Sequence, residues 1–282
     1  MRRLNFLNYE ILNIHAAALV LGAAGLLSRL VGVLRNRLLF AEFGAGRELD
    51  IYYAAFQIPD FMAVLFLLGA ASAAVLPIFQ EYLTTDKKKA QEFIAALAGL
   101  FFLGSAAAAL AAFFTAPFAV RFVAPGFSPQ EQAFTATLAR IMLLSPILFG
   151  LSGIFSVVVQ SYRLFFVYAL APILYNLGII LGIVLLVPIF GVPGLGMGVV
   201  LGAAAHFGLQ LGAAASRGFH FDPSLACIMM QAKLGSKWKP REAAAPSCRP
   251  KCAAAPSTTP IPSPGTPKIG TSNTMPNIMP RL

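Results

Sequence analysis

The chain has 282 residues, of which 58% are hydrophobic and only 11% are charged, and its mean hydropathy is +0.75. Soluble domains carry about 25% charged residues, so this composition excludes an ordinary soluble protein and indicates an integral membrane protein. The net charge of +10 does not indicate a nucleic-acid-binding face, because residues 217–282 hold nine basic and two acidic side chains and so contribute +7 of it.

Six membrane-spanning helices are predicted, because the apolar stretches reach the roughly 20 residues that a helix needs to cross a bilayer. A polar leader over residues 1–15 precedes them and lacks the apolar run of a signal peptide. The predicted spans are residues 16–40, 49–82, 93–120, 131–162, 164–188 and 193–216. They predict an all-α transmembrane lobe over residues 16–217.

Local signals predict where these helices bend and begin. The segment 49–82 is too long for one straight span, so we expect it to be tilted, broken or extended past the interface. Pro59 and Pro77 are expected to kink it. Ser128 followed by Pro129 is typical of a helix start.

Basic side chains between the spans predict the orientation in the membrane, because Lys and Arg favour the cytoplasmic side. With the N-terminus inside, seven basic residues fall on the inner side and two on the outer side: Arg2, Arg3, Lys87, Lys88, Lys89, Arg163 and Arg217 against Arg47 and Arg121. This bias predicts that both termini are cytoplasmic.

Residues 218–282 differ from the rest of the chain, because they are basic and rich in Pro, Ala and Ser. Eleven of the twenty prolines lie in residues 223–282, and such a composition cannot build a packed core, so we predict a disordered tail. Contact with anionic lipid, a solvated linker and the product of a shifted reading frame are open alternatives. Cys248 and Cys252 lack a following histidine, so no metal site is expected there.

The first predicted span carries arginines that a lipid-facing helix does not tolerate. Gly22, Gly25, Arg29, Gly32 and Asn36 form one stripe at helical spacing. An arginine near the bilayer centre costs from about 2.5 to more than 10 kcal/mol, so it normally faces a bundle interior or an aqueous cavity. The stripe therefore indicates a cavity-lining face, although small residues at this spacing also serve close helix packing.

Asp60 is the mid-span charge of the second predicted span and matches Arg29 in depth. The helical rise places Arg29 roughly 17 Å and Asp60 roughly 15 Å from the outer ends of their spans. We expect the two to form an ion pair. The alternative is that Asp60 caps the kink at Pro59.

Several motifs of the chain follow the order and spacing of a known family. They are Ser28-Arg-Leu-Val-Gly-Val-Leu-Arg35, Phe43-Gly-Ala-Gly46, Asp50-Ile-Tyr-Tyr-Ala-Ala-Phe-Gln-Ile-Pro-Asp60, Gly69-Ala-Ala-Ser-Ala73, Pro77-Ile-Phe-Gln-Glu-Tyr82 and Ala124-Pro-Gly-Phe127. Over residues 16 to about 225 the chain resembles the MurJ/MviN lipid II flippases. These belong to the multidrug/oligosaccharidyl-lipid/polysaccharide exporter superfamily.

The resemblance implies a flippase that moves lipid II, the undecaprenyl-pyrophosphate-linked peptidoglycan precursor, across the bacterial cytoplasmic (inner) membrane for cell-wall synthesis. It also implies alternating access between two lobes, with membrane lipids and cell-wall synthesis proteins as further partners. Arg29 and Arg35 match two arginines with which the family is expected to hold the pyrophosphate, and Asp50 matches an acidic family position.

Departures from the family pattern are expected to change the cavity. Asn36 stands where the family often has Asp, and Gln57 stands where it often has Lys or Arg. Both residues, with Asp50 and Asp60, are expected to support the cavity. Family members have around fourteen spans in two lobes, so with six predicted spans we expect a truncated copy, or a lobe that pairs with a second polypeptide.

Two other functions stay open on the sequence. One is export of another solute or lipid-linked oligosaccharide within the same superfamily, and the other is an inactive membrane scaffold or remnant. An enzyme is not expected, because His15, His206 and His220 are isolated and no catalytic or metal-ligand spacing is present. His206, among glycines and alanines, is expected to be a packed neutral histidine, and we expect no cofactor, metal or nucleic-acid partner.

Overall fold

The structure is a computed structural model that describes residues 9–69 and 72–221. These residues belong to the compact unit Met1–Trp238. The side chains of residues 65–74 are not part of the description. The predictions made for the start of the leader and for the tail beyond residue 221 lie outside the described residues.

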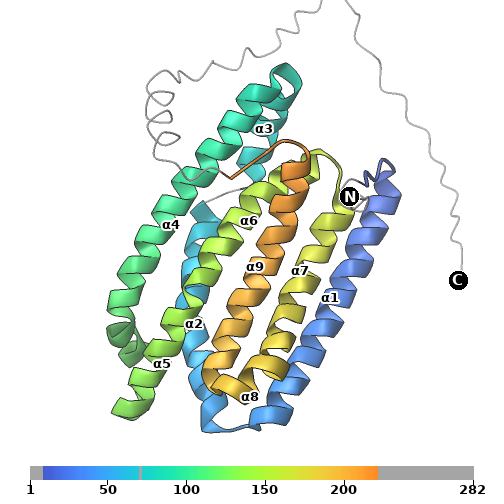
Figure 1. Cartoon of the computed structure of the whole chain (residues 1–282). Coiled ribbons are helices and arrows are strands. Elements are labelled where there is room, and N and C mark those ends of the chain that lie inside the picture. Colours follow the sequence, from blue (N-terminus) through green and yellow to red (C-terminus); the bar gives the residue numbers. More distant parts are fainter. Residues whose placement is uncertain (1–8, 70–71, 222–282) are drawn as a thin grey trace, which may run out of the picture. The chain divides into compact units, whose positions relative to one another are not determined.

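The described residues form helices joined by short connections, which confirms the all-α fold class (Figure 1). Its elements are α1 (Ile14–Phe43), α2 (Arg47–Gly69), α3 (Ser72–Thr85), α4 (Lys87–Val123), α5 (Pro129–Met142), α6 (Leu144–Ser161), α7 (Phe165–Leu181), the π-helix η2 (Gly182–Leu186), α8 (Val187–Phe190) and α9 (Val192–Ser216).

Within the described residues, five helical segments are long and apolar enough to cross a membrane. They are Ile14–Phe43, Lys87–Val123, Pro129–Ser161, Phe165–Phe190 and Val192–Ser216. The segment 49–82 is not among them; it contains most of α2 and α3, with residues 70 and 71 outside the description. The chain is thus a multi-pass membrane protein, and its division into six spans stays a prediction.

The helix starts follow from local chemistry. The Asn13 side chain caps α1 by accepting a hydrogen bond from the His15 N–H at 2.9 Å. Ser128 caps α5 with Pro129 in the first turn, and Glu131 bonds back to the Ser128 N–H at 2.7 Å, so a complete capping box is present. The predicted helix start at Ser128 and Pro129 is confirmed.

Pro117 lies inside α4 and has no N–H, so the carbonyl of Phe113 loses its hydrogen-bond donor within the helix. In lipid such a carbonyl must find another donor. Arg140 of α5 supplies it, since its Nε donates to the Phe113 carbonyl at 3.0 Å while its guanidinium lies 4.9 Å from the centre of the Phe113 ring. The charge of Arg140 in the span Pro129–Ser161 therefore has a structural use.

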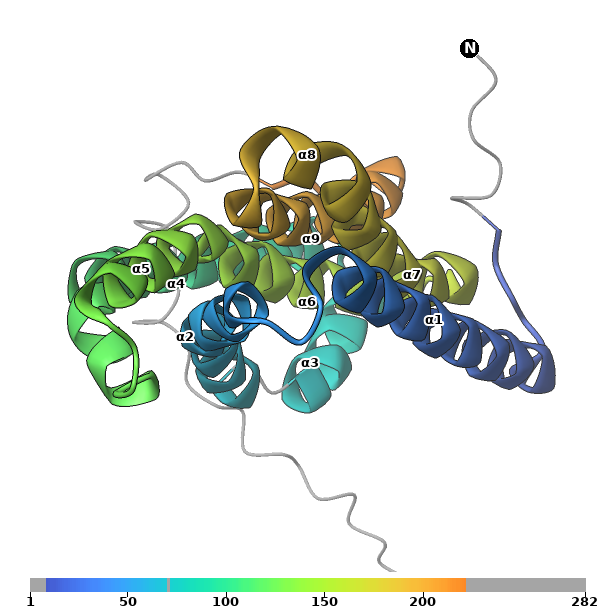
Figure 2. The same ribbon diagram turned by 90° about the horizontal axis from the view of Figure 1, so that it is seen from below.

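Helix α7 and the start of η2 pack against α9 at backbone contact distance. A Cβ added to Gly178 would lie 2.3 Å from Cα of Gly202, and one added to Gly182 would lie 2.4 Å from Cα of Gly198. Small residues allow this approach between membrane helices. In Figure 2, α7 lies between α9 and α1, and α6 lies on the other side of α9.

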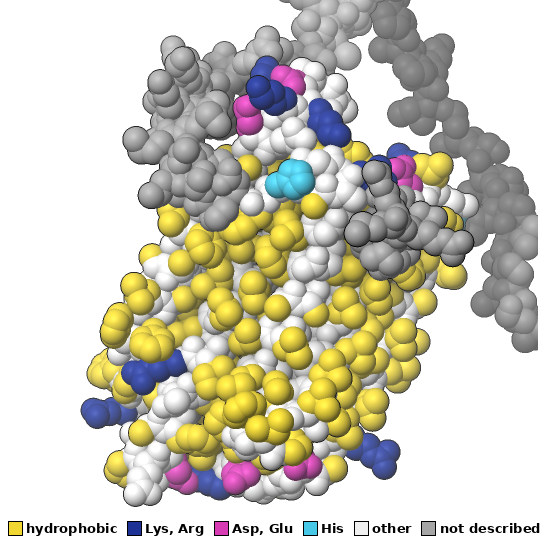
Figure 3. Space-filling model, in the orientation of Figure 1, with side chains coloured by type: hydrophobic (Ala, Val, Ile, Leu, Met, Phe, Trp, Pro, Cys, Tyr) yellow, Lys and Arg dark blue, Asp and Glu magenta, His cyan; other side chains and the backbone are white. Residues whose placement is uncertain are grey.

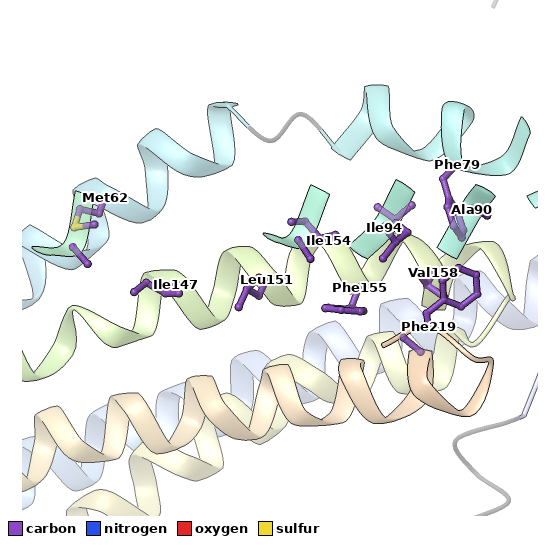
Figure 4. Close-up of a cluster of buried hydrophobic side chains, with 14 of the residues drawn as sticks. Met62, Phe79, Ala90, Ile94, Ile147, Leu151, Ile154, Phe155, Val158 and Phe219 are labelled. Atoms are coloured by element: carbon purple, nitrogen blue, oxygen red, sulfur yellow. The ribbon is translucent and has the colours of Figure 1, made fainter. Parts of the chain in front are cut away.

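The main hydrophobic cluster gathers around α6 (Figure 4). Phe155 of α6 is fully buried, and its cluster includes Phe79 of α3 and Ile94 of α4. Phe219, just after α9, closes the cluster with its ring 5.5 Å from that of Phe79. This core fixes α6 as the central helix against which the functional cavity is built.

The surface in Figure 3 is apolar along the flanks of the helices, while most acidic and basic side chains gather at the two ends. Leu26 of α1 is 62% exposed and Phe114 of α4 is 71% exposed. Lipid-facing side chains explain this exposure, because large apolar surfaces are rare on soluble monomers. The pattern agrees with a multi-pass membrane protein.

Candidate functional site

A cavity of about 660 Å³ opens between α1, α2, α6, α7 and α9. Its volume is in the range of small-molecule sites. Most of its wall is aromatic or aliphatic, and its polar lining includes two groups of side chains and the carboxylate of Asp60 on α2. We call Arg35 and Asn36, together with Asn176 that bonds to Arg35, the cationic end. We call Ser152, His206 and Gln210 the amide end.

The cationic end is built on Arg35 of α1. Its Nε and Nη2 donate to Oδ1 of Asn36 at 3.1 and 3.0 Å, and its Nη1 donates to Oδ1 of Asn176 at 3.0 Å. Both partners are neutral amides. Among the described ion pairs none involves Arg35, so its charge has no carboxylate within 4 Å.

Asn176 of α7 holds Arg35 because its own amide is fixed on the other side. Its Nδ2 donates to the Pro172 carbonyl at 3.1 Å and to Oγ of Ser28 on α1 at 3.3 Å. The residue is only 9% exposed. This three-way contact sets the rotation of α1 against α7 and aims the Arg35 guanidinium at the cavity, which Arg35 lines.

Aromatic rings connect the two ends of the cavity. The Phe149 ring of α6 lies edge-on to Tyr175 at 4.8 Å and edge-on to His206 at 5.2 Å. Tyr52 and Tyr53 of α2 line the cavity as well. Such walls bury apolar surface and leave polar tips for a ligand.

The amide end lies where α6 faces α9. Ser152 Oγ and His206 Nδ1 form a hydrogen bond of 2.7 Å. Gln210 is 1% exposed, and its Oε1 has no hydrogen-bond partner among the described residues. His206 is half-buried and lines the cavity, so it is not simply packed among glycines and alanines as its sequence neighbourhood suggested.

The structure brings together only some of the residues predicted from the sequence. Arg35, Asn36 and Asp60 line the cavity. Arg29 and Gln57 are exposed and do not line it, and the same holds for Asp50 in the first turn of α2. Their roles in ligand binding stay predictions.

The expected ion pair between Arg29 and Asp60 is not present among the ion pairs of the described residues. Arg29 lies six residues before Arg35 on α1, so it sits about 9 Å farther along the axis and on a different face. The packing face of α1 runs through Ser28, which bonds to Asn176, and Gly32, where an added Cβ would lie 3.7 Å from Asn176 Oδ1. Gly22 and Gly25 have open space around them within the described chain.

Sequence reasoning did not select Asn176, Ser152 or Gln210. The signal that points to two of them is an uncommon side chain in a membrane span: Asn176 and Gln210 stand in the 53 uncharged residues from Leu164 to Ser216. Polar residues inside a span usually face a bundle interior or a cavity. No group of three or more metal-binding side chains is found in the described part of the chain.

A comparison with known families finds a match over most of the described residues. The family model for the lipid II flippase MurJ matches residues 40–240. The lipid II flippase MurJ of Burkholderia cenocepacia is 31% identical over 205 residues, which is 71% of this chain and 40% of that protein. The probable lipid II flippase MurJ of Rhizobium tropici is 32% identical over 167 residues, which is 56% of this chain and 31% of that protein.

The fold is similar to that of a solved structure, the inward closed conformation of lipid II flippase MurJ. The match has a TM-score of 0.61 at 23% sequence identity and covers 78% of this chain and 46% of that one. The chain thus spans less than half the length of the relatives it matches. At this identity the solved structure supports the fold.

Proposed function

Because the chain belongs to the lipid II flippase MurJ family, with residues 40–240 matching the family model, we propose that its cavity binds the pyrophosphate of lipid II. The bound lipid is then carried across the bacterial cytoplasmic membrane for peptidoglycan synthesis. We assign to the chain the binding of this lipid and no chemical reaction.

The observation that supports this proposal is the state of Arg35. Two neutral amide oxygens hold its three guanidinium nitrogens, and no ion pair of the described residues involves it, so the side chain is fixed in place without a carboxylate partner within 4 Å. A diphosphate leaving water needs such a preorganised cation, and guanidinium–phosphate contacts are among the strong charge-assisted hydrogen bonds. The neutral side chain of Asn36 leaves the Arg35 guanidinium available to a phosphate, whereas a carboxylate at this position would form an ion pair with it.

The proposal includes an orientation. Seven basic side chains on one side against two on the other favour cytoplasmic N- and C-termini. The cavity is walled by α1, α2, α6, α7 and α9, and alternating access around a midplane site requires a second lobe that rocks against the first. We therefore propose that transport, as distinct from binding, needs this second lobe, whether from the same or from another polypeptide.

A lipid-binding experiment tests the role of Arg35. The purified 282-residue chain in lipid nanodiscs is titrated with undecaprenyl pyrophosphate and with the uncharged undecaprenol. Arg35→Gln is compared with Arg37→Gln, since Arg37 is exposed on the same helix and does not line the cavity. Loss of one charged hydrogen-bonding partner is worth about 1.5–3 kcal/mol, so the Arg35 variant should bind the pyrophosphate lipid about 10- to 150-fold more weakly.

The control and the neutral lipid decide the interpretation. Arg37→Gln should bind the pyrophosphate lipid as the wild type does, and undecaprenol should bind equally weakly to all three proteins. Equal affinity of wild type and Arg35→Gln for the pyrophosphate lipid would contradict the proposal. So would a wild type that does not distinguish the two lipids.

A further inference from the structure

The amide end of the cavity contains a buried acceptor that the protein leaves unused. Gln210 is 1% exposed, yet its Oε1 has no partner among the described residues. Leaving a buried acceptor unpaired costs about 1–3 kcal/mol, so packing alone is a poor reason for a Gln here. Gln210 lines the cavity, and its terminal torsion is broad enough for the amide to turn toward a ligand.

The Ser152–His206 pair adds further hydrogen-bonding groups beside Gln210. Its bond of 2.7 Å joins Ser152 Oγ to His206 Nδ1. In a neutral imidazole one ring nitrogen donates and the other accepts, and a hydroxyl both donates and accepts. The pair therefore offers both a donor and an acceptor to a ligand, and neither residue is a carboxylate or an obligate cation.

The distance between the two ends follows from the packing of α7 against α9. Gly178 lies beside Gly202 and Gly182 lies beside Gly198, so the two antiparallel helices are in register. Asn176 is then level with Ala204 of α9, and Gln210 lies six residues, or about 9 Å, farther along the axis. A ligand held by its phosphate at the cationic end would place the next group of the same molecule near Gln210.

We propose that Ser152, His206 and Gln210 form a second subsite that binds the hydroxyl and amide groups of the sugar attached to the lipid pyrophosphate. This inference rests on the proposed function and assigns the glycan to the amide end of the same cavity. The chemistry favours a sugar over a second phosphate, because the subsite has no Lys or Arg. It favours a sugar over a cation, because none of the three subsite residues is a carboxylate and the carboxylate that lines the cavity, Asp60, is on α2. The Phe149 ring, in contact with His206, supplies an apolar wall for the sugar.

The test compares two ligands that differ only in the glycan. The 282-residue chain in nanodiscs is titrated with lipid II and with undecaprenyl pyrophosphate, and the ratio of the two affinities is measured. The wild type should prefer lipid II. Gln210→Leu should reduce that preference about fivefold, as expected for one lost hydrogen bond, while its affinity for undecaprenyl pyrophosphate stays unchanged.

Three further variants separate ligand contact from structural damage. Gln91→Leu removes an amide that donates to the Gly218 carbonyl at 2.7 Å, away from the cavity, and should keep the wild-type ratio. Ser152→Ala is a small change that should lower the ratio even if Gln210→Leu fails to fold. Arg35→Gln should weaken both ligands equally and leave the ratio unchanged.

The outcomes also separate this inference from the proposed function. A wild type that binds both pyrophosphate lipids with equal affinity would overturn the glycan subsite and leave the pyrophosphate site standing. A Gln210→Leu or Ser152→Ala variant that weakens both ligands in proportion would overturn the subsite too, because it would show a structural role. A wild type that binds neither lipid would contradict the proposed function itself.

Discussion

The contact between α7 and α9 is the feature of this fold that a single methyl group should disrupt. In Gly178→Ala the new Cβ would meet backbone atoms of Gly202, with Cα at 2.3 Å and N at 2.5 Å. Ordinary contacts of a Cβ begin at 3.4 Å, so the two helices must separate locally by about 1 Å. Backbone atoms cannot swing aside as a side chain does.

The expected cost follows from overpacking, which amounts to about 1–3 kcal/mol. Alanine in place of glycine favours a helix by up to about 1 kcal/mol, so the matched control must contain the same exchange without the clash. Gly208 lies on α9 with nothing within 4 Å of its added Cβ. Gly208→Ala should be neutral or stabilising, and Gly178→Ala should be less stable than it by about 2 kcal/mol, or roughly 4–8 °C in melting temperature.

Thermal unfolding of the purified protein in detergent measures this difference, and lipid binding measures its effect on the cavity. Asn176 and Arg35 depend on the position of α7, so Gly178→Ala should also weaken binding of the pyrophosphate lipid. If both alanine variants melt at the same temperature, the close packing of α7 and α9 is not the constraint that we describe.

Two further predictions follow from single contacts, and a third follows from the distribution of basic residues. In Asn36→Asp a carboxylate accepts the bonds from Nε and Nη2 of Arg35 and neutralises its charge, so affinity for undecaprenyl pyrophosphate should fall about tenfold. Unchanged or tighter binding would show that the charge of Arg35 does not hold the ligand. Arg140→Leu removes the donor to the Phe113 carbonyl and should lower the melting temperature by several degrees, whereas Arg121→Leu should not; equal melting of the two would refute the role of Arg140. For orientation, a cysteine replacing Lys88 should be protected from a membrane-impermeant thiol reagent in intact cells, and one replacing Gly126 should react; the reverse pattern would invert the topology.

The parts of this protein that were predictable from sequence are those set by local chemistry. The Ser128 capping box needs only residues three apart, and hydropathy identified the long apolar helices. Arg35 was predicted from its match to an arginine of the family motif, whereas the cost of an arginine in an apolar span placed Arg29 on the cavity face. These signals do not depend on which helices become neighbours.

The remaining features depend on tertiary packing. The one-stripe prediction placed Arg29 with the cavity face, but α1 meets α7 through Ser28 and Gly32, and this rotation brings Arg35 to Asn176 while Arg29 stays exposed. The distance of Gln210 from the cationic end follows only from the glycine-mediated register of α7 and α9. An amide in a span signals that some polar environment exists, and it does not say which helix provides it.

Photo-crosslinking tests most directly whether lipid II enters this cavity. A photoreactive amino acid is placed at Ala63, which lines the cavity on α2, or at the adjacent Val64, which is 45% exposed and does not line it. With labelled lipid II in nanodiscs, the probe at Ala63 should crosslink to the lipid, excess undecaprenyl pyrophosphate should suppress the product, and the probe at Val64 should give only a weak background. Equal labelling at the two positions, or labelling at Ala63 that undecaprenyl pyrophosphate does not suppress, would contradict a pyrophosphate-binding cavity centred on Arg35.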